Sequence, residues 1–221
     1  MMRKNYERAL KALQDEVLVM ASMVEKSIMR SIEALKNRDL ELARQIIADD
    51  EAINNKRFDI EEQCVELIAT QQPMAVDLRI IIAILNMLVD LERIGDHSEG
   101  IAKITIMVGD EPPIKPLIDL PRMAEKACQM LREAMDAFIG RDVALAKKIC
   151  DDDKEVDALY EQVFRELLII MAENPKTIKR ATRLIWVAHN LERSADRITN
   201  ICERVVFIAT GHMEDIGASK Y

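Results

Sequence analysis

The chain is poor in the residues that build turns and strands. Its 221 residues include six glycines, six prolines and only 4% aromatic residues. A turn-rich β-protein needs glycine and proline in its turns and aromatic residues along its strands, so this class is disfavoured. Leucine, alanine, glutamate, lysine and methionine are abundant instead, and all of them favour helices. The composition therefore predicts an all-α protein.

Basic charge is also in deficit, because the formal net charge is −8 at pH 7. Proteins that bind DNA, RNA or anionic lipid through charge need a positive field that displaces counterions. The chain as a whole offers no such field. We therefore expect no nucleic-acid partner.

Long apolar runs are missing as well. The first residues carry charges throughout and contain no apolar core of a secretory signal. The longest apolar run, Ile80 to Leu91, is interrupted by Asn86 and Asp90 and is shorter than the ~18 to 20 residues of a membrane span. We expect a helix buried in protein and no membrane span. We expect a cytoplasmic protein, which can still dock on a complex at the inner face of the cell membrane.

The four cysteines form no closely spaced pair, since Cys64, Cys128, Cys150 and Cys202 are far apart in the sequence. This spacing excludes a zinc site built from four thiolates. Each cysteine lies within a helical pattern, which indicates reduced and mostly buried thiols, as expected in the cytosol.

Apolar residues recur at spacings of three and four in several long stretches, as in amphipathic helices. In the first half we expect one helix with its stripe from Leu10 to Leu35 that ends near Asn37, a second capped by Asp39 and continuing to Thr70, and a third from Asp77 to about Val108. The prolines and glycine between Gly109 and Pro116 mark the only clear linker.

The same order returns after the linker. We expect a helix from about Leu117 to Ile139 with Gly140 as its C-cap, a long helix capped by Asp142 and ending at Glu173, a break at Asn174 and Pro175, and a last helix to about Thr210. The tail from Gly211 to Tyr221 is expected to fray.

The two halves also match residue by residue. RDLELARQIIADD at 38–50 is similar to RDVALAKKICDDD at 141–153, and LERIGDH at 91–97 is similar to LERSADR at 191–197. An internal duplication explains both matches. We predict two tandem three-helix bundles, each with its own core: residues 1–108, a linker at 109–117, and residues 118–221.

Acidic residues spaced four apart recur at equivalent places in the two halves. Residues at this spacing lie on one face of a helix, and the sets are Glu92 with Asp96, Glu192 with Asp196, Asp153 with Asp157, and Asp50 with Asn54. With 39 acidic residues in the chain, a single pair of this kind has no meaning as a motif. Its recurrence in both halves favours a bound cation over chance placement.

Two explanations of these pairs stay open at this stage. Like charges at this spacing cost roughly 0.2 to 0.5 kcal/mol per pair unless a cation offsets them, and oxygen ligands favour Mg²⁺, Ca²⁺, Mn²⁺ or iron. Alternatively, Arg93 and Arg193 bond a carboxylate on an adjacent helix.

The histidines add little to the metal hypothesis. His189 precedes Glu192 by three residues, so it either shares the acidic face as a ligand or serves packing or capping. His97 is expected at a surface or an interface, and His212 lies in the tail. The order of His189 and Glu192 reverses the Glu-x-x-His motif of di-iron bundles, which leaves oxidation chemistry as a minor hypothesis.

The whole chain resembles the PhoU family of phosphate-transport accessory and phosphate-signalling regulators. The resemblance is carried by QPMAVDLR at 72–79, by LERIGDH at 91–97 and by LERSADR at 191–197, in two repeats of three helices. It implies metal clusters held by Asp50, Glu92 and Asp96 in the first repeat, and by Asp153, Asp157, Glu192, Asp196 and Asn200 in the second. The ion it implies is a divalent or iron cation (Fe, Mn, Mg or Zn). Because Asn54 and Gly100 stand where the family has an Asp and an Asn, the first cluster is expected to be weaker, smaller or absent.

The resemblance implies regulation by binding and no enzyme activity. The expected partners are the ATPase of a phosphate ABC transporter and a membrane sensor histidine kinase, and the expected role is to keep the phosphate-starvation response off when phosphate is plentiful. We also expect a homodimer. The alternative hypothesis is a metal-dependent, carboxylate-bridged enzyme or a metal-storage bundle.

Overall fold

The computed structural model describes residues 2–214 and 216 and is all-α in that part of the chain. Its helices are α1 (Met2–Asn37), α2 (Leu40–Gln71), α3 (Val76–Val108), α4 (Asp119–Gly140), α5 (Val143–Glu173) and α6 (Ile178–Thr210), with a 3₁₀ turn, η1 (Pro175–Thr177), before α6. The predicted fold class is confirmed, and most helix ends lie within two residues of the predicted positions.

Capping aspartates fix the start of the second helix in each half. Asp39 accepts a hydrogen bond from the Leu42 amide at 2.9 Å, and Asp142 accepts one from the Leu145 amide at 3.0 Å. The predicted C-cap at Gly140 is wrong, because α4 includes this glycine. The left-handed cap residue is Arg141, with φ of 52°. It lies at the same place in the repeat as Arg38, with φ of 56°.

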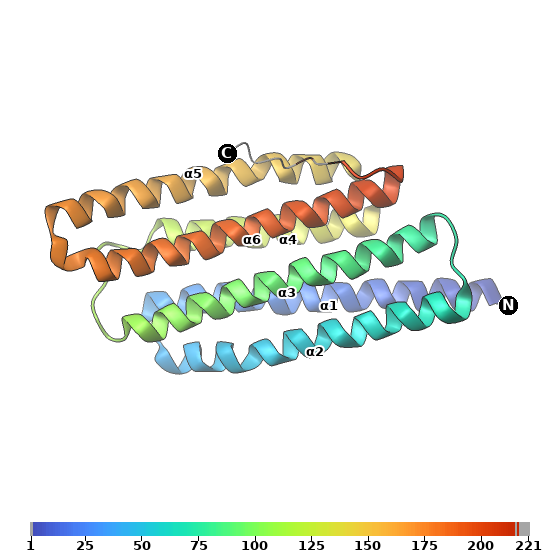
Figure 1. Cartoon of the computed structure of the whole chain (residues 1–221), viewed down its shortest axis with the longest axis horizontal. Coiled ribbons are helices and arrows are strands. Elements are labelled where there is room, and N and C mark those ends of the chain that lie inside the picture. Colours follow the sequence, from blue (N-terminus) through green and yellow to red (C-terminus); the bar gives the residue numbers. More distant parts are fainter. Residues whose placement is uncertain (1, 215, 217–221) are drawn as a thin grey trace.

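The helices form two groups of three that lie side by side (Figure 1). One group is α1, α2 and α3, the first unit, and the other is α4, α5 and α6, the second unit. Between the units, α3 contacts α6 and α1 contacts α4. Within the described residues, α2 and α5 contact only helices and η1 of their own units. The central seam of the molecule is thus made by α3 and α6.

The prediction of a separate core for each unit is wrong, because one continuous cluster of buried apolar side chains draws on all six helices. The apolar run Ile80 to Leu91 of α3 lies in the middle of this cluster, where Ile80, Ile84 and Leu91 are fully buried. Burial of a side chain of this size contributes about 1.5 to 3 kcal/mol. The unit boundaries at 1–108, 109–117 and 118–221 stay a prediction.

Part of the expected frayed tail is held in place. Gly211 caps α6 with φ of 80°, Glu214 forms an ion pair with Lys147, and the Ile216 amide donates to Glu203. The rest of the predicted frayed tail, residue 215 and residues 217–221, lies outside the described part. Across residues 2–214 and 216, no helix combines the length and the apolarity that a membrane crossing requires.

Candidate functional site

The acidic pairs of the second unit meet between α5 and α6. We call this group the second acidic cluster; it consists of Asp153, Asp157, Glu192 and Asp196. Asp153 and Glu192 are 9% and 5% exposed, and the other two are partly buried. Each pair lies on one face because four residues make about one helical turn. The predicted residues of this unit are therefore brought together, with the exception of Asn200.

Burial and mutual repulsion disfavour the charged forms of this cluster. Burial, followed by the charges of Asp157, Asp196 and Glu192, raises the pKa of Asp153 from 3.8 to about 7. Burial and then Glu192 and Asp157 raise the pKa of Asp196 to about 6. The neighbouring carboxylates thus raise the pKa of Asp153 and of Asp196, which marks a site of concentrated negative charge.

Positive charge that would compensate this cluster is sparse. The Oδ1 atom of Asp153 is buried and has no hydrogen-bond partner. Among the described residues, no lysine or arginine forms an ion pair with Asp153, Asp157 or Asp196. His189 Nδ1 lies 3.3 Å from Glu192 Oε2, and the charges of Arg193 and Arg197 partly offset the rise in the pKa of Asp196. A buried carboxylate oxygen without a partner is costly and favours an additional ligand here.

The first unit has a related group between α2 and α3, the first acidic cluster, which consists of Asp50, Asn54, Glu92 and Asp96. The Asn54 amide donates to Asp50 Oδ2 at 3.0 Å. Burial, then Glu99 and then Asp96, raises the pKa of Asp50 from 3.8 to about 6. Asp50 lies close to Gly95, where an added Cβ would come within 3.3 Å of its Oδ1 atom.

Two arginines compensate the first acidic cluster. Arg57 Nη1 lies 3.4 Å from Glu92 Oε1, and Arg93 Nη1 lies 2.8 Å from Asp96 Oδ2. Arg93 thus bonds a carboxylate of its own helix, which corrects the prediction of a bond to an adjacent helix. Arg57 was missed in the sequence, although it follows Asp50 by two helical turns. Its counterpart in the second unit is Tyr160, so the arginine from α2 has no equivalent there.

Asn200 does not join the second acidic cluster. Its amide donates to Asp90 Oδ1 of α3 at 3.1 Å, and Arg197 Nη1 lies 3.4 Å from the same oxygen. Asp90 is 7% exposed, so this contact is a buried polar link between the two units. Asn190 occupies the equivalent place on α6, and its Oδ1 atom would lie 3.2 Å from a Cβ added at Gly100. Sequence reasoning did not predict the contact between Asn200 and Asp90, because these residues are 110 positions apart in the chain.

The histidines take different places. His97 lies at the seam, where its Nδ1 atom is 3.4 Å from Ser194 Oγ, which confirms the expected interface position. Burial, followed by the charges of Arg193 and Arg197, lowers its pKa from 6.5 to about 4, so it is neutral near pH 7. His189 lies against Glu192 with half of its side chain exposed, so it is not a core residue.

The second acidic cluster fits a cation better than the first does. Its oxygen donors suit Mg²⁺, Mn²⁺ or iron, and the buried Asp153 oxygen has capacity for a ligand. In the first cluster Glu92 Oε2 is also buried without a hydrogen bond, but arginine side chains already form ion pairs with Glu92 and Asp96. No group of three or more His, Cys, Asp or Glu side chains in the described residues is arranged to hold a metal. Cation binding would therefore involve rotation of side chains.

Comparison with known proteins identifies the family. The model of the PhoU domain matches residues 17–105 and 120–205, one match in each unit. The PhoU homologue of Aquifex aeolicus, named a phosphate-specific transport system accessory protein, is 38% identical over 93% of both chains. A protein of the same name from Clostridium acetobutylicum is 37% identical over 98% of this chain and 99% of its own.

Solved structures agree with these sequences. The crystal structure of the phosphate transport system regulatory protein PhoU from Streptococcus pneumoniae superposes with a TM-score of 0.89 at 32% identity, over 95% of this chain and 99% of that one. PhoU from Pseudomonas aeruginosa gives a TM-score of 0.88 at 35% identity, over 94% and 100%. Together with the domain matches in both units, these similarities confirm the resemblance of the sequence, and the chain belongs to the PhoU family.

Proposed function

We propose that the chain is a regulatory accessory protein of phosphate transport that acts by binding. The observation that carries this proposal is the match over nearly the full length, in both units, to proteins named as accessory or regulatory components of phosphate transport systems. In this role the chain couples the ATPase of a phosphate ABC transporter to a membrane sensor histidine kinase. It works in the cytoplasm, at the inner face of the membrane, where both partners present their cytoplasmic parts.

The elongated bundle supports an adaptor role. Its long helices share one core, so a partner on each unit would be held at a fixed distance and angle from the other. Rigid, closely packed helices transmit such constraints because packed interiors resist deformation. The acidic clusters lie on equivalent positions of the two units and are available as docking surfaces of similar chemistry.

Deletion of the gene in its source organism tests the physiological role. The phosphate-starvation genes should switch on in phosphate-rich medium, and a plasmid copy should restore repression. In parallel, the purified chain should bind the purified ATPase and the cytoplasmic part of the kinase in biolayer interferometry. An unchanged starvation response together with no binding to either partner would contradict the proposal. Mass photometry of the same sample tests the expected homodimer.

The second acidic cluster is also proposed to hold a divalent or iron cation, on Asp153, Asp157, Glu192 and Asp196. The cation would neutralise the cluster and brace α5 against α6. Its support is the buried Asp153 oxygen without a hydrogen-bond partner and the absence of an arginine equivalent to Arg57. The structure presents the donors without gathering three of them around one point.

Elemental analysis after incubation with Fe, Mn, Mg and Zn tests this site. The double variant Asp153→Asn, Asp196→Asn should lose the bound metal, whereas Asp50→Asn, Asp96→Asn in the first cluster serves as the matched control and should keep it. Equal metal content in both variants, or none in the wild type, would contradict the site. Many ions per chain would favour storage, and turnover lost with the metal would favour the carboxylate-bridged enzyme.

A further inference from the structure

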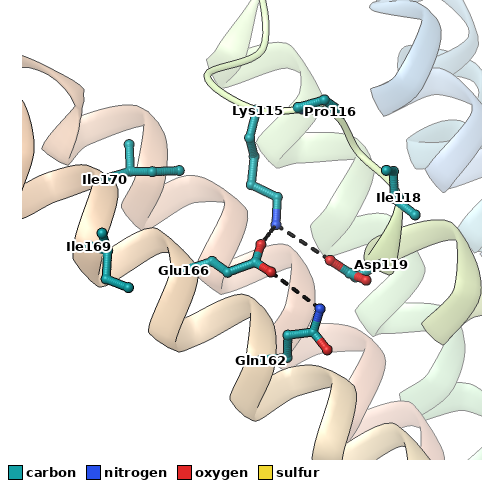
Figure 2. Close-up of a pocket in the computed structure, with 8 residues that line it drawn as sticks. All are labelled: Lys115, Pro116, Ile118, Asp119, Gln162, Glu166, Ile169 and Ile170. Atoms are coloured by element: carbon teal, nitrogen blue, oxygen red, sulfur yellow. Dashed lines mark hydrogen bonds and ion pairs between the residues drawn. The ribbon is translucent and has the colours of Figure 1, made fainter.

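An open hollow of about 540 Å³ lies on the second unit, between the segment that leads into α4 and the C-terminal half of α5. Figure 2 shows Ile118 on one side of this hollow and Ile169 on the other, with the Lys115 side chain extended between them toward Glu166 and Asp119. Ile118 and Ile169 are 61% and 59% exposed. Large aliphatic side chains on two walls of one hollow mark an apolar surface that lacks a cover.

The hollow exists because α4 is shorter than α1. The two helices end at equivalent residues, Asn37 and Gly140, but α1 has 36 residues and α4 has 22. The missing part corresponds to residues 2–15 of α1, which is about 21 Å of helix at 1.5 Å per residue. In the first unit that part of α1 packs Leu10 and Leu13 into the core. In the second unit the non-helical segment before α4 takes its place.

One position beside the hollow is apolar where the first unit is charged. At an offset of 103 residues, the exposed Ile169 of α5 stands where α2 has the exposed Glu66. The neighbouring positions Gln63 and Thr70 of the first unit correspond to Glu166 and Glu173, so the isoleucine is flanked by acidic residues. An uncovered surface would be expected to gain polar residues, whereas this one has gained an isoleucine. This difference indicates that the hollow is covered by another molecule.

The charges around the hollow favour a basic occupant. The Lys115 ammonium binds both Asp119 and Glu166, and Arg122 Nη1 lies 3.8 Å from Asp119 Oδ1, so these ion pairs balance each other. The negative charge beside the hollow comes from the C-terminal end of α5. Helix α5 ends four residues beyond Ile169, at Glu173, and has no basic residue in its last turn. The negative end of the helix dipole is therefore uncompensated beside the hollow.

We propose that this hollow is the docking site for a basic amphipathic helix of a partner protein. The first unit shows what such an element is like, because residues 2–15 carry four basic and two acidic residues, with Tyr6, Leu10 and Leu13 at spacings of four and three. Helices that bind in grooves use anchors at these spacings. The proposal does not depend on the phosphate role, since it rests on the difference between the two units.

A synthetic peptide with the sequence of residues 2–18 of this chain is the probe. Labelled with fluorescein, it should bind the full chain saturably in fluorescence anisotropy. Ile169→Glu places the residue of the first unit in the hollow and should weaken binding at least tenfold. Val65→Glu, which adds the same charge at an exposed apolar position of α2, is the matched control and should bind as the wild type does. Circular dichroism verifies that both variants are folded.

The proposal would be overturned if the peptide did not bind the full chain saturably, or if the wild type and Ile169→Glu bound the peptide equally well. A peptide whose basic residues are replaced by glutamine should bind more weakly, and equal binding would refute a basic occupant. Light scattering of the chain alone provides the last test, because a dimer that Ile169→Glu converts to a monomer would show that a second copy covers the hollow.

Discussion

The charge of Asp153 should destabilise the metal-free protein, and its removal should show by how much. In the unfolded chain the carboxyl has a pKa of 3.8, and in the folded protein burial and its acidic neighbours raise the pKa to about 7. Well below pH 3.8 the group is protonated in both states and contributes no pH dependence. As the pH rises from 4 to 7, only the unfolded state releases the proton readily, so stability falls.

The size of this effect follows from the two pKa values. Each pKa unit of difference between the folded and unfolded states corresponds to about 1.4 kcal/mol. The rise in the pKa from 3.8 to about 7 therefore lowers the free energy of unfolding at pH 8 by about 4 kcal/mol, taken as an upper limit. Asp153→Asn preserves the shape of the side chain and removes the charge. The variant should therefore be more stable than the wild type at pH 8, by up to about this amount, and should gain little at pH 4.

Urea denaturation with a chelator, at pH 4, 6 and 8, measures the difference in free energy of unfolding. The matched control is Asp59→Asn, which removes the charge of an exposed aspartate on α2 and should not reproduce the gain at pH 8. If the wild type and Asp153→Asn lose stability in parallel between pH 4 and pH 8, the carboxyl is not buried among like charges and the argument for the second acidic cluster fails. Addition of a divalent cation should reduce the difference in free energy of unfolding between the wild type and Asp153→Asn at pH 8.

Three further predictions concern single contacts. Arg57→Ala removes the ion pairs of Arg57 with Glu61 and Glu92 and should lower the free energy of unfolding by about 1 to 2 kcal/mol, whereas Arg44→Ala, in an exposed pair, should change it by less than about 0.5 kcal/mol; equal effects would contradict a stabilising role of Arg57 between α2 and α3. Asp90→Ala removes the acceptor of Arg197 and Asn200 at the seam and should cost about 2 to 3 kcal/mol in urea denaturation, while an unchanged midpoint would refute the role of the link. Asp39→Ala and Asp142→Ala each remove an N-cap and should each lower stability by about 1 kcal/mol; thermal melts that show a loss for only one would contradict their equivalence.

Local sequence signals predicted the helices well. The caps Asp39 and Asp142 were identified from residue type and position because an N-cap interaction spans only three residues. The error at Gly140 has a local cause as well, since the arginine that follows it adopts the left-handed conformation that usually belongs to glycine. The acidic pairs were found because a spacing of four and a duplication are both visible in one chain.

Contacts between distant segments were not predictable in this way. The choice of Arg57 as the partner of Glu92 depends on how α2 and α3 are rotated against each other, and neither helix alone specifies that rotation. Asn200 was assigned to the acidic cluster by the resemblance to the PhoU family, but its side chain bonds Asp90 of α3 instead. The continuous core was not predicted for the same reason. The apolar stripes of each unit can be explained by packing within that unit, and the shared core becomes visible only when α3 is seen to contact α6.

The seam has the geometry of an interface between two copies of one protein. Residue 90 faces residue 200, and residue 100 faces residue 190, so exchanging the two units maps the first contact onto the second. Such self-complementary contact is the mark of a twofold interface. A single three-helix unit that paired with itself would therefore have been the ancestor of this chain. Fusion of its two copies then allowed each side of the interface to change independently, and the aspartate at residue 90, where the second unit has Asn190, is one result of that freedom.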